Sequence, residues 1–191
     1  MTLDELRAAI KADPDNAAYT AAGWEPLYTA GPTARIVVVG QAPGRKAQEA
    51  GIPWRDASGA KLCGWMGVTD ELFHDPSSFA IVPMDFYYPG KGATGDLPPR
   101  AGFAEKWHPQ LLADMPDVRL TILIGSYALK HYLGPRRRKT LTETVREHGD
   151  YAPFFPLVHP SPLNFRWQAK NPWFVDETVP ALQAAVAAAL A

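Results

Sequence analysis

The sequence predicts an α/β protein, a three-layer α/β/α sandwich with a central four-stranded parallel sheet. Two observations support this prediction: the chain contains four short apolar runs, the first of them β-branched, and helical patterns fill the intervals between them. Strands that alternate with helices form parallel sheets, because each crossover helix covers one face of the sheet. A length of 191 residues with 47% hydrophobic residues suits one core. We therefore expect one domain over residues 1–191.

The helices are predicted from capping patterns and apolar spacing. Thr2 stands at an N-cap position and Glu5 occupies the third helical position, which together form a capping box. Apolar residues at helical spacing predict the later helices, at about 60–66, 103–114, 126–133, 140–148 and 173–190.

Four apolar runs predict the strands of the sheet, at 36–40, 79–86, 120–125 and 154–158. Pro83 lies inside the second run and implies a bend there. Pro156 lies inside the fourth run and cannot donate a hydrogen bond to a neighbouring strand. We therefore expect the fourth strand to lie at an edge of the sheet.

Composition limits the classes of protein that remain. The formal net charge is -1, so any contact with nucleic acid must depend on local positive charge. The single cysteine, Cys63, cannot supply an iron–sulfur or thiolate zinc site, and the histidines lack metal-ligand spacing. No apolar run reaches the roughly 20 residues of a membrane helix. We expect a cytoplasmic monomer that needs no metal and no cofactor and has no membrane partner.

Polar or glycine- and proline-containing segments follow the predicted strands. Residues 40–44 read GQAPG, and residues 159–164 read HPSPLN. Glycine lets a backbone approach a ligand closely, and proline fixes the turn that presents it. Because ligands of open α/β sheets bind beyond the carboxyl ends of the strands, these turns predict the functional site.

The GQAPG and HPSPLN turns resemble the two signature motifs of the uracil-DNA glycosylase superfamily. The segment GIPWRDASGAKL at 51–62 also resembles this family, and the resemblance covers about residues 35–167. The Asp-Ala-Ser-Gly stretch at 56–59 is closest to the branch called family five, although the chain lacks the iron–sulfur cysteines. The resemblance implies hydrolysis of the bond between uracil and deoxyribose in DNA, after the base has been flipped out of the helix.

Two catalytic residues follow from the resemblance, Asp56 and His159. The first motif lacks the carboxylate that many relatives carry, so Asp56 is the candidate for orienting water and supporting the cationic sugar. The alternative is that Asp56 only caps the helix that starts near Ser58. His159 is the candidate for donating a hydrogen bond to uracil O2 as negative charge develops on the base. Its alternative is a structural histidine.

The base pocket is expected to contain Trp54, which stacks on the flipped base; core packing is the alternative. Many relatives read the uracil edge with an asparagine near the second strand, and here that asparagine is missing. Asp85 is expected to accept a hydrogen bond from uracil N3–H, with Asn164 or backbone groups completing the recognition. Backbone contacts to the base or water are expected from the first motif, at Gly40, Gln41 and Ala42.

DNA contacts are expected around both turns. Leu163 is the candidate wedge that fills the vacated base stack, and an ordinary core leucine is its alternative. Arg137 belongs to the basic run 135–139, which either grips phosphates or forms a solvated surface. Lys91 and Arg100, in the long loop 88–100, are similar phosphate candidates. The remaining expected contacts come from the turns themselves, at Pro43, Gly44, Ser161 and Pro162.

The sequence therefore favours a monofunctional uracil-DNA glycosylase that releases free uracil from single- or double-stranded DNA, because no amine nucleophile stands in the motifs. One alternative keeps the reaction and changes the base to hypoxanthine, xanthine or mismatched thymine. Another is a catalytically silent nucleic-acid-binding module. A Rossmann-like nucleotide enzyme is disfavoured, since no G-x-G-x-x-G follows the first strand.

Overall fold

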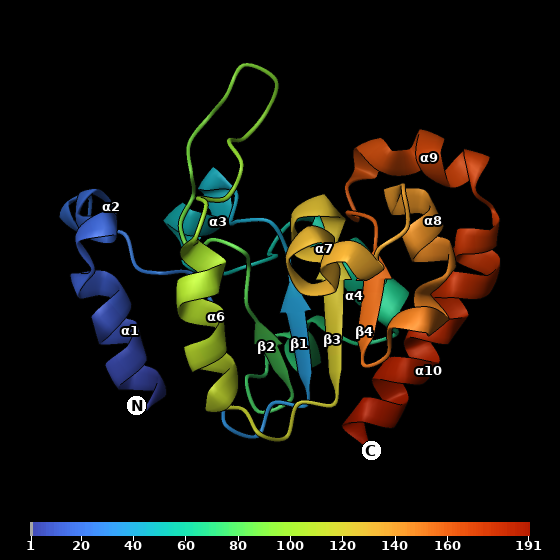
Figure 1. The fold of residues 1–191 in the computed structure, drawn as a ribbon, viewed down its shortest axis with the longest axis horizontal. Helices are drawn as coiled ribbons and strands as arrows, with labels where there is room; N and C mark the ends of the chain where they lie inside the picture. Colours follow the sequence, from blue (N-terminus) through green and yellow to red (C-terminus); the bar gives the residue numbers. More distant parts are fainter. Residues whose placement is uncertain (1) are drawn as a thin grey trace.

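A computed structural model describes residues 2–191 of the chain. Its centre is a parallel sheet with strand order β2-β1-β3-β4 (Figure 1). The strands are β1 (Ile36–Val39), β2 (Phe79–Ile81), β3 (Leu120–Ile124) and β4 (Phe154–Leu157). The predicted four-stranded parallel sheet is confirmed, and β4, which contains Pro156, lies at an edge as expected.

Helices cover both faces of the sheet and complete the three layers (Figure 1). One face packs against α1 (Leu3–Ala12), α6 (Phe103–Ala113) and α7 (Gly125–Leu133). The other packs against α4 (Ala57–Met66) and α10 (Val179–Leu190). Side chains of β1 alternate between the two cores: Val37 and Val39 enter the first, and Ile36 and Val38 enter the second. Both faces are apolar, as expected for a parallel sheet between two helical layers.

The remaining helices are short. Sequence analysis did not predict the helices α2 (Ala17–Ala21), α3 (Arg45–Ala50), α5 (Asp70–Phe73) and α9 (Phe165–Lys170). The predicted helix 140–148 appears as α8 (Leu141–Arg146), and the predicted helix 173–190 is divided into a π-helical turn, Phe174–Thr178, followed by α10. Across residues 2–191 no helix has the length and apolarity to cross a membrane.

The capping box at the start of α1 is confirmed. The Thr2 hydroxyl accepts from the Glu5 backbone N–H at 3.2 Å, and the Glu5 carboxylate accepts from the Thr2 N–H at 2.8 Å. Leu6 and Ile10 on the inner face of this helix are fully buried. They join the core beneath α6, so the N-terminal helix is part of the layer that flanks β2.

β2 is shorter than the predicted run 79–86, because Pro83 ends the regular ladder. The chain nevertheless stays beside the turn after β1: the N–H groups of Met84 and Asp85 donate to the carbonyls of Gly40 and Gln41. It then leaves the sheet as a long loop over residues 88–100, which rises beyond the carboxyl ends of the strands (green, top of Figure 1).

Candidate functional site

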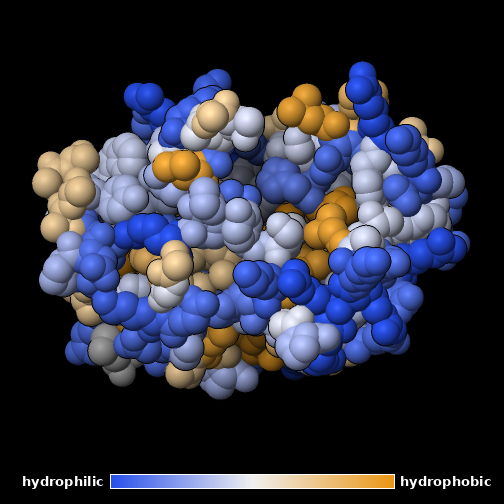
Figure 2. Space-filling view, turned by 45° about the horizontal axis from the view of Figure 1, so that its top comes forward, coloured by the Kyte–Doolittle hydropathy of each residue, from blue (hydrophilic) through white to orange (hydrophobic). Residues whose placement is uncertain are grey.

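A pocket of about 400 Å³ lies at the carboxyl ends of the strands. The turn after β1 forms its floor, and the segments after β2 and β4 form parts of its walls. In Figure 2, which turns this end of the molecule forward, apolar side chains are visible between largely hydrophilic neighbours. The pocket brings together eight residues that the sequence placed in the site: Gly40, Gln41, Ala42, Pro43, Gly44, Trp54, Asp56 and His159.

Trp54 forms one wall of the pocket through an unusual backbone conformation. It is the one non-glycine residue of the described chain with a positive φ, at 58°. Its indole lies so close to Gly40 that a Cβ there would meet the ring at 2.9 Å, and a Cβ on Gly59 would lie 1.7 Å from the Trp54 carbonyl oxygen. Such a left-handed conformation costs about 1–3 kcal/mol and is found mostly at functional sites. Both glycines are therefore required to seat this tryptophan.

Asp56 both caps a helix and lines the pocket. It is the N-cap of α4, where one carboxylate oxygen accepts from the Gly59 backbone N–H at 2.9 Å, and it also lines the pocket. The cap holds the negative charge at the positive end of the helix dipole. Capping and exposure to the pocket are thus compatible, and the second carboxylate oxygen has no part in the cap bond.

His159 stacks against Trp54 at the wall of the pocket, with ring centroids 5.5 Å apart and ring planes 29° from parallel. Desolvation lowers the pKa of His159, and the negative charge of Asp56 opposes this effect only in part. The ring is therefore neutral near pH 7. The Ser161 backbone N–H donates to Nδ1 at 3.1 Å, so the single proton of the neutral ring lies on Nε2. His159 can then donate a hydrogen bond into the pocket without carrying charge.

The HPSPLN segment is a rigid turn that ends in the 3-10 turn Pro162–Asn164. The Ser161 hydroxyl accepts from the Leu163 N–H at 3.2 Å, and the Asn164 side-chain amide donates to the His159 carbonyl at 2.6 Å. Leu163 is 83% exposed, so it is not a core residue. The turn therefore presents an apolar side chain to solvent beside the pocket.

Asn164 lies outside the main pocket. It borders a second hollow of about 290 Å³, which shares Gln41 and His159 with the main pocket. Ser126 and Tyr127, at the start of α7, also line this hollow. The amide nitrogen of Asn164 is occupied by the turn itself, so its evident role is to hold His159 in place.

The expectation for Asp85 is corrected by the structure. Its side chain is 0% exposed and is not among the residues that line the pocket. One oxygen accepts from Arg100 Nε at 2.7 Å and the other from Arg100 Nη2 at 2.8 Å. Tyr87 and Arg100 also donate their backbone N–H groups to this carboxylate. A buried carboxylate needs such hydrogen-bond partners. Here they occupy both oxygens, so neither oxygen of Asp85 is available to accept a hydrogen bond from a base.

Arg100 is corrected together with Asp85. It was one candidate for a phosphate contact, yet its guanidinium also donates from Nη1 to Asn16 Oδ1 at 2.8 Å and stacks against the ring of Tyr19. Because Asp85 precedes the long loop and Arg100 ends it, this ion pair closes the loop at its base. Both residues act on the loop rather than on a ligand directly.

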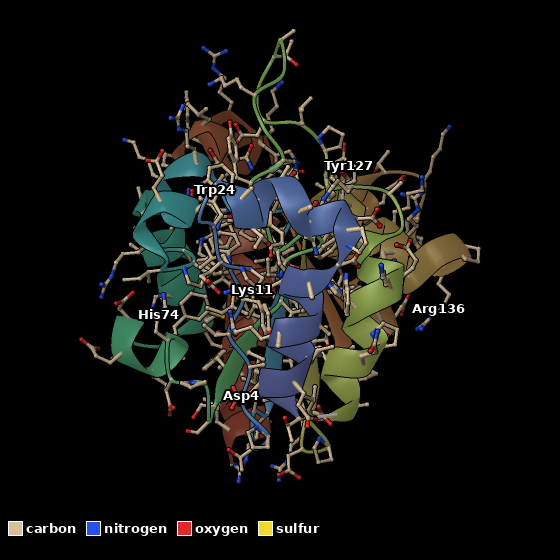
Figure 3. All side chains as sticks on the ribbon, turned by 90° about the vertical axis from the view of Figure 1, so that its left-hand side faces the viewer. Asp4, Lys11, Trp24, His74, Tyr127 and Arg136 are labelled. Atoms are coloured by element: carbon tan, nitrogen blue, oxygen red, sulfur yellow. The ribbon has the colours of Figure 1, made fainter. Side chains whose placement is uncertain are left out.

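The basic run 135–139 lies apart from the pocket. Arg137 borders a different hollow, together with Lys130 and Lys139, while Arg138 is paired with Glu147 and Asp150. In Figure 3, Arg136 projects from the flank of the molecule. The structure therefore does not bring Arg137 together with the other predicted site residues.

The pocket residues that sequence analysis did not place in the site include Asp96 and Leu97. They belong to the loop 88–100, in which sequence analysis singled out only Lys91 and Arg100, as phosphate candidates. The Gln41 side chain donates to the Leu97 carbonyl at 3.4 Å and joins this loop to the turn after β1.

Comparison with known families agrees with this arrangement. The sequence model of the Uracil DNA glycosylase superfamily matches residues 28–183. The matched part contains all four strands, both strand-end turns and the loop that reaches the pocket.

Proposed function

Because the chain belongs to the uracil-DNA glycosylase superfamily, we propose that it excises uracil from DNA as a monofunctional glycosylase, releasing free uracil. Membership makes the protein a DNA-acting glycosylase, a hydrolase of base-excision repair. Uracil as the base is our proposal. The observation that carries it is the convergence of Trp54, Asp56 and His159 on one pocket of about 400 Å³, which is large enough for a flipped base.

The proposed reaction divides its work between two side chains. Asp56 orients a water molecule toward C1′ of the sugar and stabilises the oxocarbenium-like transition state by its charge. The C1′–N1 bond breaks, its electron pair moves onto the base, the water oxygen bonds to C1′, and the water proton passes to Asp56 or to solvent. His159 donates from Nε2 of its neutral ring to O2 of the departing base, and this hydrogen bond strengthens as negative charge develops on O2.

Trp54 provides the stacking surface for the base. Its indole is held between Gly40 and His159, so the face offered to a ligand is already oriented before binding. Base–aromatic stacking contributes about 1–3 kcal/mol and is tolerant of base identity. Stacking therefore explains capture of a flipped base but not the choice of base.

The test of the activity is excision from oligonucleotides that carry one modified base. Purified protein is incubated with a uracil-containing strand, single or paired, and the product is treated with alkali. Cleavage at the former uracil is expected. Cleavage only at hypoxanthine, xanthine or mismatched thymine would change the base and keep the reaction. Intact strands with every base, together with measurable DNA binding, would indicate a silent binding module.

Leu163→Ala is expected to slow uracil excision from double-stranded DNA about 10- to 100-fold, because the wedge that fills the vacated stack is lost and unstacking costs a few kcal/mol. Excision from single strands is expected to change much less. Since Leu163 is 83% exposed, the melting temperature should not fall. The matched control is Val175→Ala, which trims another exposed apolar side chain outside both pockets. Equal slowing on single and double strands would contradict the wedge role.

A further inference from the structure

The loop 88–100 brings a carboxylate into the pocket, and the proposed chemistry does not use this carboxylate. The pocket has five polar side chains among its lining residues: Gln41, Asp56, Ser58, Asp96 and His159. Asp56 and Ser58 come from the start of α4, and His159 follows β4. Asp96 arrives from the other side, on the loop that follows β2.

Strand order separates Asp96 from His159 across the pocket. β2 and β4 are the opposite edges of the sheet, and the turn after β1 lies between the segments that follow them. Three strand spacings of about 4.8 Å place the axes of β2 and β4 about 14 Å apart. A planar base fits between the loop after β2 and the turn after β4. The proposed roles of Asp56 and His159 put the sugar end of the base beside them, which leaves its far edge toward Asp96.

Asp96 is held in the loop by local contacts. Its backbone pairs with Lys91 in an antiparallel bridge, and the Tyr88 hydroxyl donates to its carboxylate at 3.3 Å. The next residue, Leu97, donates its N–H to the Gly90 carbonyl at 2.9 Å. At the base of the loop, the buried ion pair of Asp85 with Arg100 closes the segment. The position of Asp96 is therefore built into the fold.

We propose that Asp96 is the specificity-determining residue of this pocket, an inference that rests on the proposed function. Asp96 recognises the flipped base by accepting a hydrogen bond from a ring N–H on the far edge of the base. An ionised carboxylate is an acceptor only. Cytosine N3 and adenine N1 carry a lone pair, which a carboxylate repels. Deamination turns these atoms into the N–H donors of uracil and hypoxanthine. An acceptor at this position distinguishes a deaminated base from its parent.

This assignment replaces the role that sequence analysis gave to Asp85. Both carboxylates belong to the same excursion of the chain after β2, but only Asp96 lines the pocket. Asp85 then acts as a positioning residue, since its bond to Arg100 holds the loop that carries Asp96. The substrate class that follows is a base with a ring N–H beside a carbonyl group.

The experiment measures the binding of free uracil and free cytosine to the protein by ligand-observed NMR titration, which requires no cleavage. Asp96→Ala is expected to weaken uracil binding about tenfold, since uracil loses a hydrogen bond to a charged acceptor, and to leave cytosine binding equal or stronger, since the repulsion of its N3 lone pair is removed. Asp96→Glu keeps an ionised, acceptor-only carboxylate and is expected to restore most of the preference for uracil. The control is Asp117→Ala, an exposed carboxylate just before β3, at the other end of the sheet.

Three results would overturn this role: a uracil-to-cytosine ratio in Asp96→Ala within threefold of that of the unaltered protein, equal weakening of both bases, or a lost preference that Asp96→Glu does not restore. Excision assays with the same variants separate this inference from the proposed function. If the unaltered protein prefers free uracil but cuts no DNA, the activity is wrong and the recognition role stands. If it cuts uracil and Asp96→Ala keeps its base preference, the recognition role is wrong.

Discussion

Asp56→Asn is expected to lower the single-turnover rate of uracil excision about 100- to 10,000-fold, the range that a positioned acid or base contributes. The variant removes the negative charge that faces the sugar, while the amide oxygen can still accept the hydrogen bond from Gly59 N–H. Asparagine caps helices about as well as aspartate, so α4 should remain intact. The substitution thereby separates catalysis from capping.

The protonation state of His159 does not confound this comparison. Desolvation lowers the pKa of His159, and the charge of Asp56 raises it. Removing that charge lowers the pKa further, so the ring is neutral near pH 7 in both proteins. Loss of rate in Asp56→Asn at neutral pH therefore reports on the carboxylate itself.

The measurement is the rate of strand cleavage with enzyme in excess over DNA, alongside the melting temperature and DNA affinity of each variant. Thr140→Ala is the matched control, because it uncaps α8, whose N-cap Thr140 accepts from Glu143 N–H, without touching the pocket. That variant should lose stability and keep its rate. An Asp56→Asn protein that cuts at the normal rate would reduce Asp56 to a helix cap.

Asp85→Asn is expected to destabilise the protein by about 3–5 kcal/mol, the cost of leaving one member of a buried ion pair without its partner. Asp85 is 0% exposed, and both of its oxygens accept hydrogen bonds from the Arg100 guanidinium. The amide introduced by Asp85→Asn would offer one acceptor oxygen and no negative charge. The Arg100 guanidinium would then still bear the cost of desolvation but would lose its counter-charge.

Urea unfolding followed by tryptophan fluorescence measures this loss. The matched control is Glu49→Gln, which breaks the exposed pair of Glu49 with Arg45 and should leave the unfolding midpoint unchanged. Replacing both buried partners, as Asp85→Leu with Arg100→Met, should cost less than Asp85→Asn alone, because no uncompensated charge remains. An Asp85→Asn protein as stable as the parent would show that the pair contributes little to the fold.

Local signals in the sequence were sufficient for the architecture. Short apolar runs located the four strands, Pro156 predicted that β4 lies at an edge, and Thr2 with Glu5 predicted the capping box of α1. These signals work because backbone conformation and burial depend chiefly on neighbouring residues and on a simple period. Since parallel strands end at one edge, the same signals predicted that the GQAPG and HPSPLN turns would meet.

Tertiary contacts decided which side chains reach the pocket. Asp85 stood at the expected strand end, yet it points into the protein and pairs with Arg100, 15 positions later in the chain. Asp96 was passed over in the sequence, yet the loop returns it to the pocket. The physical reason is that a buried charge must be paired with whatever partner the fold brings to it. After the irregular turn at Pro83 the side chains no longer follow a regular repeat, so the sequence does not indicate in which direction they point.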